Sequence, residues 1–149
     1  MNVVNQPGVP VGGFKTIGQI DPTNSLCFRE DRNGLMVALD LLATHTAGAP
    51  VVDDRMRYLG FINEFDVMRA LDNGKDLSKL QAKDIMRKAR LTVTDSTPIS
   101  QAAKLMEEHH VLSLPVEKGG TVLYSVMTGQ LRPICTHLGS ILLCGLLWG

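Results

Sequence analysis

Three features are scarce in this chain of 149 residues: cysteine, net charge and catalytic motifs. The three cysteines, Cys27, Cys135 and Cys144, are widely spaced and form no C-x-x-C pattern, which argues against a disulfide framework and against a zinc site. Fifteen basic residues balance fifteen acidic ones, so no field of one sign favours nucleic acid. No secretory signal is visible at the N-terminus. We therefore expect reduced thiols, a cytoplasmic location and no nucleic-acid partner.

Motifs for catalysis are also absent. The sequence contains no nucleophile elbow, Walker loop, dinucleotide fingerprint or zinc-protease helix. His45, His109 and His110 have no Cys, Asp or Glu cluster at metal-ligand spacing. We expect neither a metal site nor enzymatic activity. An enzyme would need a residue of perturbed pKa in a pocket, which a sequence does not display.

An internal repeat is the strongest signal that the chain does contain. When the sequence is shifted by 65 residues against itself, identical residues align without a gap, among them Ile20 with Ile85, His45 with His110 and Pro50 with Pro115. A unit of roughly 60 residues is too small to bury its own sheet face. The two copies should therefore pack against each other and share one core.

Each copy has the same predicted order of elements: short strand, helix, strand, hairpin, strand, helix. The apolar residues Ile99, Ala102, Ala103 and Met106 have helical spacing, and the matching positions of the first copy repeat it. Thr97-Pro98 predicts the cap and first residue of this helix. The fold class is thus α/β, with two pseudo-symmetric β-α-β-β-α repeats packed through their small sheets.

The first copy has a well-marked junction between its last strand and its last helix. Leu59–Ile62 is apolar and suits a strand, Asn63 can cap the following helix, and Asp66 falls in the first helical turn. The helix dipole stabilises a carboxylate there, whose oxygens could accept hydrogen bonds from the diol of a ribose. The alternative is that Asn63 and Asp66 only cap the helix, as a capping box with Asp in place of Glu.

The sequence also predicts boundaries. We expect an irregular arm over 1–13, the first repeat over 14–74, a linker over 75–82, the second repeat over 83–133 with an incomplete last helix, and an apolar tail over 134–149. Pro133 falls early in the last helix, and no Lys, Arg, Asp or Glu follows it. A tail packed on the domain or a second subunit, an altered reading frame, and a membrane-associated end remain open, the last being least favoured because the stretch is short for a bilayer.

The chain from Phe14 to Leu131 resembles the tandem CBS domain pair, or Bateman module. Four motifs carry the resemblance: Lys83-Asp84-Ile85-Met86, Leu91-Thr92-Val93-Thr94, the paired strand starts Gly48-Ala49-Pro50-Val51 and Ser113-Leu114-Pro115-Val116, and Gly60-Phe61-Ile62-Asn63 with Asp66. In that family the junction commonly reads Gly, two apolar residues, Thr or Ser, two variable residues and Asp. The second junction here has Tyr124 for the Gly, Met127 for the hydroxyl residue and Gln130 for the Asp. We therefore expect one good nucleotide site and one that is degenerate or empty.

The resemblance also implies a set of ligand-binding residues. Asp66 would hold the ribose, Asn63 would donate to phosphate, and apolar side chains and backbone near each Pro-Val pair would clamp the adenine. The full predicted set is Asp66, Asn63, Gly60, Phe61, Ala49, Pro50, Thr92, Val93, Thr94, Leu114, Pro115 and Arg87. For the apolar members ordinary core packing is the competing interpretation, and for Arg87 it is solvated surface charge.

The implied function is that of a stand-alone regulatory module. It would bind AMP, ADP or ATP between the repeats, with S-adenosylmethionine or NAD less favoured, and would signal to an unknown regulated protein through a change of conformation or of a homodimer. No cofactor is required. The alternative is a structural module that dimerises or tethers a partner protein and has an empty cleft.

Overall fold

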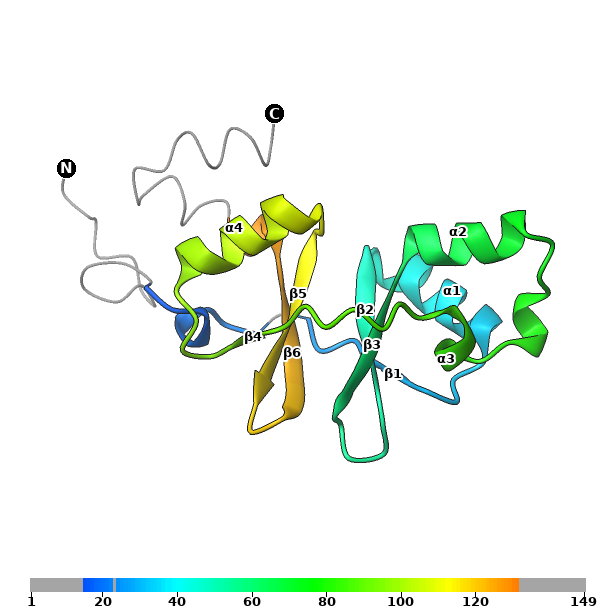
Figure 1. Ribbon diagram of the computed structural model, residues 1–149, viewed down its shortest axis with the longest axis horizontal. Coiled ribbons are helices and arrows are strands. Elements are labelled where there is room, and N and C mark those ends of the chain that lie inside the picture. Colours follow the sequence, from blue (N-terminus) through cyan, green and yellow to red (C-terminus); the bar gives the residue numbers. More distant parts are fainter. Residues whose placement is uncertain (1–14, 23, 132–149) are drawn as a thin grey trace.

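The computed structural model describes residues 15–22 and 24–131 and shows two small sheets that face each other at the centre of the molecule (Figure 1). The first sheet consists of β1 (Phe28–Arg29), β2 (Gly48–Val52) and β3 (Tyr58–Asn63), and the second of β4 (Val93–Thr94), β5 (Ser113–Lys118) and β6 (Thr121–Met127). In each, the middle strand is parallel to the first and antiparallel to the third. The predicted α/β fold of two pseudo-symmetric repeats is confirmed. The predicted arm and tail lie outside the described residues.

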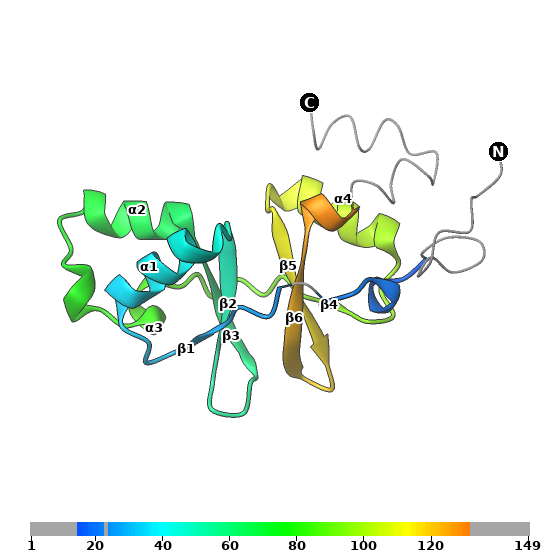
Figure 2. The ribbon, with the colours of Figure 1, turned by 180° about the vertical axis from the view of Figure 1, so that it is seen from behind.

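The helices cover the outer sides of the two sheets, as Figures 1 and 2 show from opposite directions. The first repeat has α1 (Gly34–Thr44) and α2 (Glu64–Asp72), and the second has α4 (Ile99–His109). η2 (Leu77–Lys79) lies between the repeats, α3 (Ala82–Ile85) leads into the first strand of the second repeat, and η1 (Ile17–Gln19) leads into the first strand of the first. Within the described residues, no helix combines the length and the apolar character that crossing a bilayer requires. The start of the expected last helix, residues 128–131, is helical, and the rest lies outside the described residues.

The helices α1 and α4 end in the same way. Each C-cap is a histidine in the left-handed region, His45 with φ 51° and His110 with φ 52°. The two histidines that align in the repeat thus hold the same structural position, at the C-terminal end of a helix. At the other end, Asn33 caps α1 by accepting hydrogen bonds from two backbone N–H groups. Pro98 is the N-cap of α4, so the expectation that it is the first helical residue was wrong by one position.

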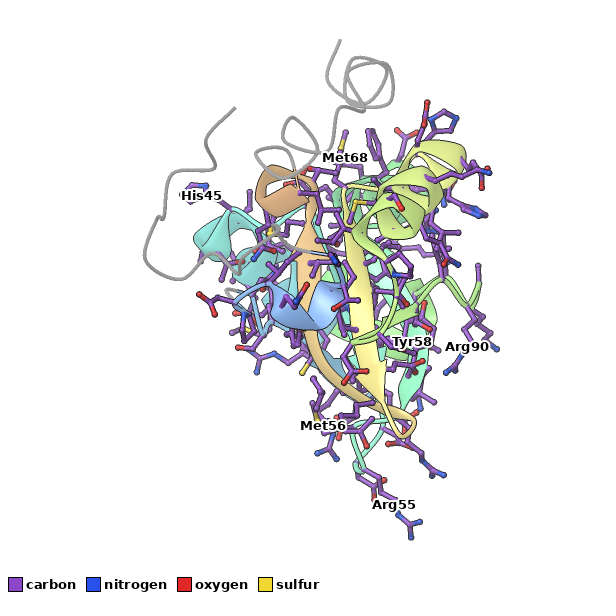
Figure 3. All side chains as sticks on the ribbon, turned by 90° about the vertical axis from the view of Figure 1, so that its left-hand side faces the viewer. His45, Arg55, Met56, Tyr58, Met68 and Arg90 are labelled. Atoms are coloured by element: carbon purple, nitrogen blue, oxygen red, sulfur yellow. The ribbon has the colours of Figure 1, made fainter. Side chains whose placement is uncertain are left out.

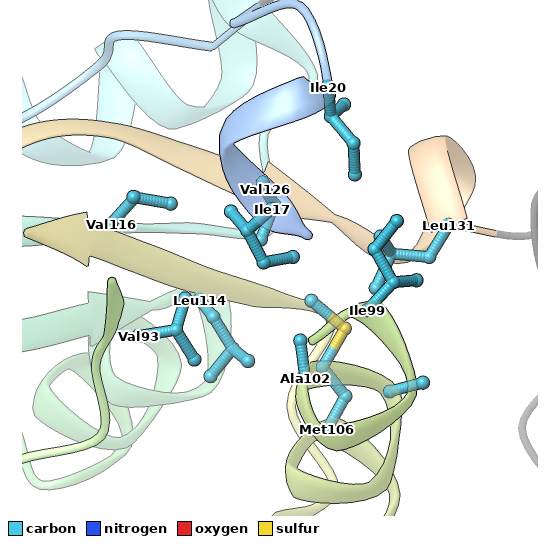
Figure 4. Close-up of a cluster of buried hydrophobic side chains, with 11 residues drawn as sticks. Ile17, Ile20, Val93, Ile99, Ala102, Met106, Leu114, Val116, Val126 and Leu131 are labelled. Carbon is cyan, nitrogen blue, oxygen red and sulfur yellow. The ribbon is translucent and has the colours of Figure 1, made fainter. Parts of the chain in front are cut away.

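The expectation of one shared core was wrong, because each repeat has its own. The first core lies between the first sheet and α1 and α2, and contains Phe28, Val37, Val51 and Ile62. The second contains the predicted helical face of Ile99, Ala102, Ala103 and Met106 against β5 and β6 (Figure 4). A third, smaller cluster lies at the seam, the surface where the two sheets meet, and is formed by Val52, Tyr58 and Val122.

Each core is completed by the segment that leads into the first strand of the other repeat. Ile17 and Ile20, at the start of the first repeat, are buried in the second core, whereas Ala82 and Ile85, at the start of the second, are buried in the first. The backbone hydrogen bonds of this exchange match at the 65-residue offset: Ile17 N–H to Thr97 O (2.9 Å) and Gly18 N–H to Asp95 O (2.7 Å) correspond to Ala82 N–H to Arg32 O (2.8 Å) and Lys83 N–H to Glu30 O (3.0 Å). This exchange gives the small units enough apolar surface to bury.

Candidate functional site

The junction between β3 and α2 places Asp66 where the sequence predicts it, in the first turn of the helix. The Asp66 N–H donates to Asn63 Oδ1 at 2.9 Å, and Asp66 Oδ2 accepts from the Asn63 N–H at 2.9 Å. This reciprocal pair is a capping box with Asp in the position usual for Glu, as the alternative interpretation supposed. It fixes the carboxylate at the helix N-terminus, with 1% of the side chain exposed.

The Asp66 carboxylate also forms two ion pairs. Arg87 Nε lies 3.1 Å from Oδ1 and 3.2 Å from Oδ2, and Arg69 Nη1 lies 3.4 Å from Oδ1. Both arginines are partly in solvent, with side chains 46% and 64% exposed. In this conformation the oxygens that were expected to accept from a diol are occupied by protein donors.

The chain between α3 and β4, which we call the linker from here on, extends beyond the predicted linker of 75–82, carries Arg87 and runs directly against the junction. Phe61 and Arg87 exchange two backbone hydrogen bonds, each of 2.9 Å. A Cβ on Gly60 would come within 2.6 Å of the Arg87 carbonyl oxygen and 2.7 Å of the Met86 sulfur. Gly60 is therefore needed where the linker backbone approaches, and that approach brings Arg87 to Asp66.

The second junction keeps the cap but not the charge. Gln130 Oε1 accepts from the Met127 N–H at 2.9 Å, as Asp66 accepts from Asn63 in the first junction. Asn24 Nδ2 lies 3.6 Å from the sulfur of Met127, where the first junction has a hydrogen-bonding amide. A neutral amide at the position of Asp66 provides no acidic anchor.

An open hollow of about 690 Å³ lies beside this second junction. It is lined by the chain before β1, the end of α1 and the end of β6: Asn24, Ser25, Leu26, Cys27, Thr44, His45, Thr46 and Met127. Burial raises the pKa of the Cys27 thiol, and Arg29 lowers it to a smaller extent. The hollow thus combines two segments of the first repeat with the junction of the second.

The repeat symmetry relates this hollow to the surroundings of Asp66. Shifted by 65 residues, its lining segments become 89–92 and 109–111, and Met127 corresponds to Asn63 across the shorter second hairpin. Tyr58 O–H donates to the Ala89 carbonyl at 2.8 Å, which holds one of these segments against the first repeat. Figure 3 shows Tyr58 and Arg90 on one side of the molecule and His45, which lines the hollow, on the other. The surroundings of Asp66 are therefore the pseudo-equivalent of the hollow beside the second junction.

The apolar residues of the predicted ligand set lie in the cores and at the seam. Ala49, Val93 and Leu114 are core residues, at most 4% exposed. Pro50 and Pro115 are buried opposite Phe61 and Ser125 in the strand register. Phe61 is partly buried at the seam. Any contact of the three core residues with a ligand would have to come from their backbone.

The polar members of the set form local networks. Thr92 Oγ1 donates to Glu117 Oε2 at 2.8 Å, and Thr94 is exposed and hydrogen-bonds within its own turn with Ser96 and Thr97. Arg90 Nη2 donates to both oxygens of Glu117 at 2.7 Å and lies over the Tyr58 ring. Sequence reasoning missed Glu117, a buried carboxylate in a strand that otherwise reads as apolar up to Val116. No signal in the sequence indicates its pairing with Arg90 and Thr92, because these contacts span 27 and 25 residues.

A different surface feature lies on the outer side of the first repeat. Seven large apolar side chains of α1 and α2 are 40–71% exposed: Leu35, Met36, Leu39, Leu42, Phe65, Met68 and Leu71. We call them the apolar helix face. A hollow of about 680 Å³ next to α2 is lined by Phe65, Met68, Arg69, Leu71 and Asp72. Among the described residues, no group of three His, Cys, Asp or Glu side chains lies close enough together to hold a metal ion.

The comparisons with known proteins define the class. The model of the CBS domain matches twice, at residues 17–73 and 82–128. The chain therefore belongs to the CBS domain family and contains a tandem pair of these domains.

The chain is similar to several characterised proteins. It is 27% identical to the chloroplast CBS domain-containing protein CBSX2 of Arabidopsis thaliana, over 85% of this chain and 66% of the relative. It is 32% identical to arabinose 5-phosphate isomerase KdsD of Yersinia pestis, over 49% of this chain and 22% of the relative. The chain thus spans only part of these curated relatives.

Solved structures show the same fold. The crystal structure of CBSX2 in complex with AMP superposes with a TM-score of 0.72 at 24% identity, covering 85% of this chain and 99% of that one. The CBS domain pair of protein MJ0100, in complex with 5′-methylthioadenosine and S-adenosyl-L-methionine, gives a TM-score of 0.71 at 18% identity, covering 83% and 97%.

Proposed function

We propose that the chain is a regulatory module that binds an adenosine-containing nucleotide in the cleft of the first junction. The buried Asp66 carboxylate at the start of α2 carries this proposal. Charge-assisted hydrogen bonds from ribose hydroxyls would each contribute about 1.5–3 kcal/mol. Asn63 and the N-terminus of α2 would face phosphate. The ligands bound to CBSX2 and to the MJ0100 pair support an adenosine moiety.

AMP, ADP or ATP suits this cleft better than a ligand without phosphate. Arg87 lies at the anchor and supplies a cation, and Thr92, which directly precedes β4, follows five residues further along the chain. S-adenosylmethionine and NAD are less favoured ligands. The hollow at the second junction would bind such a ligand weakly or remain empty, since Gln130 replaces the acidic anchor.

The signal would be a shift of population between two arrangements of the repeats or of two modules. The apolar helix face supports a homodimer, because exposed apolar groups of this extent commonly mark an interaction site. The regulated protein would sense which arrangement prevails. We propose that the module performs no chemistry itself and works in a reducing compartment such as the cytoplasm.

Calorimetric titration of the purified chain tests the nucleotide site. AMP, ATP, S-adenosylmethionine and NAD are titrated into the wild type, into Asp66→Asn and into the control Asp40→Asn, which removes an ion pair on α1. We expect binding of AMP or ATP that weakens about tenfold or more in Asp66→Asn and is unchanged in the control. No binding at millimolar ligand, or equal binding by Asp66→Asn, would remove the proposed site.

The second candidate function is a ligand-free dimerisation module. It is favoured by the apolar helix face and by the engagement of Asp66 with protein donors. Sedimentation of the same samples separates the two functions. A dimer that forms equally with and without nucleotide, in a chain that releases no heat with any of the four ligands, would support this candidate.

A further inference from the structure

The anchor carboxylate of the first junction is already paired in the ligand-free chain. Arg87 Nε is within hydrogen-bond distance of both Asp66 oxygens, and the carboxylate is almost fully buried. A ribose diol needs these same oxygens as acceptors. Binding therefore requires that Arg87 leave them.

The Arg87 side chain can move away from the carboxylate while its backbone stays beside the junction. Its backbone is held by the two hydrogen bonds with Phe61, while 46% of its side chain is in solvent. The guanidinium can thus swing about a fixed Cα. Arg90, three residues further on, is already committed to Glu117 through two contacts of 2.7 Å.

The released guanidinium needs a new anion. A nucleoside supplies hydroxyls to Asp66 but leaves Arg87 with water alone. A nucleotide supplies both hydroxyls for Asp66 and phosphate oxygens for Arg87, and guanidinium groups bind phosphate in a bidentate manner. Only the phosphorylated ligand can replace the ion pair between Asp66 and Arg87 by two charge-assisted contacts, one to each residue.

We propose that Arg87 is a specificity-determining residue that closes the Asp66 anchor in the ligand-free protein and opens it by transferring to the phosphate of the ligand. This inference rests on the proposed nucleotide site and deepens it. Arg87 acts against unphosphorylated adenosine and in favour of AMP. Arg69, with one longer contact of 3.4 Å from the same helix as Asp66, has a minor part.

The test compares adenosine with AMP in calorimetric titrations of the wild type, Arg87→Gln and the matched control Arg69→Gln. In the wild type AMP binds more tightly than adenosine. In Arg87→Gln we expect the ratio of the two affinities to fall about tenfold or more, with adenosine binding better than in the wild type and AMP worse. In Arg69→Gln the ratio should change much less.

The outcomes separate this inference from the proposed function. If Arg87→Gln binds both ligands with the wild-type ratio, the exchange by Arg87 is wrong while the nucleotide site stands. If adenosine weakens as much as AMP, Arg87 merely supports the cleft and the inference also fails. If the wild type binds neither ligand, the proposed function fails and this inference with it. Thermal unfolding of each variant checks that it is folded.

Discussion

The two junctions of this chain differ in charge at one equivalent position, and the comparison shows what the start of a helix requires. In both, a side-chain oxygen three residues into the helix accepts the N–H of the cap residue at 2.9 Å: Asp66 for Asn63, and Gln130 for Met127. A neutral amide thus performs this half of the cap in the second repeat. The negative charge in the first repeat exceeds what the cap needs, and it is buried beside a cation that reaches it from the linker. That surplus charge is the strongest structural argument for a ligand site.

The exposed faces of α1 and α4 also differ between the repeats: that of α1 is apolar and that of α4 is polar. On α1 the exposed residues include the four large apolar side chains Leu35, Met36, Leu39 and Leu42, whereas the equivalent positions of α4 hold the polar residues Ser100, Gln101, Lys104 and Glu107. Lys104 and Glu108 form an exposed ion pair. Helix propensity and packing on the sheet are satisfied in both repeats. The apolar surface of α1 therefore points to a partner of the first repeat, as proposed for the homodimer.

The largest expected effect tests the exchange that links the two repeats. Ile17 lies at the start of the first repeat in sequence but is 0% exposed in the core of the second, whereas Ala82 holds the equivalent place in the first. We expect Ile17→Ala to lower the free energy of unfolding by about 2–5 kcal/mol, because the cavity lies within a packed core. Urea unfolding monitored by circular dichroism measures this loss.

The control for this variant is Leu123→Ala, which truncates a residue that is 46% exposed on β6. It should change the free energy of unfolding by less than about 1 kcal/mol. If Ile17→Ala were as mild as Leu123→Ala, the segment at the start of the first repeat would not be part of the second core, and the symmetry of the exchange would be lost.

A smaller effect is expected at the close approach of the linker. Gly60→Ala places a Cβ against the Arg87 carbonyl, whereas Tyr124 at the equivalent position of the second repeat is partly exposed and packs on its core. We expect a loss of about 1–3 kcal/mol in the free energy of unfolding, since backbone must shift to admit the methyl group.

Gly129→Ala is the matched control for this change, because a Cβ there meets nothing within 4 Å. It should be close to neutral. Equal stability of the two variants would show that the linker does not press on the junction, and would weaken the case that Gly60 positions Arg87.

The sequence predicted the repeat, the fold class and the cap well, because these follow from periodicity and local chemistry. The match of Ile20 with Ile85 at the 65-residue offset indicated that the two residues play the same part in their repeats. It did not indicate that each would be buried in the core of the other repeat. The pairing of Asp66 with Arg87 spans 21 residues and depends on how the linker crosses the seam. Neither propensity nor spacing encodes such a contact, and for the same reason Glu117 was missed.

The smallest effect concerns the two hairpins. The first is organised by Asp53, which accepts hydrogen bonds from the Arg55 and Arg57 N–H groups and from Arg57 Nε, whereas the second turns through Gly119 and Gly120 with positive φ. These bonds, that from the Arg57 backbone first, lower the pKa of Asp53.

A carboxyl whose pKa is lowered by folding stabilises the protein above its ordinary pKa, and this contribution disappears as the pH falls through the lowered value. We expect Asp53→Asn to lower the thermal midpoint slightly at pH 7, and the difference from wild type to shrink below about pH 4. The exposed neighbour Asp54→Asn should show no such trend, and a difference in Asp53→Asn that persists unchanged into acid would show that the carboxylate does not organise the turn.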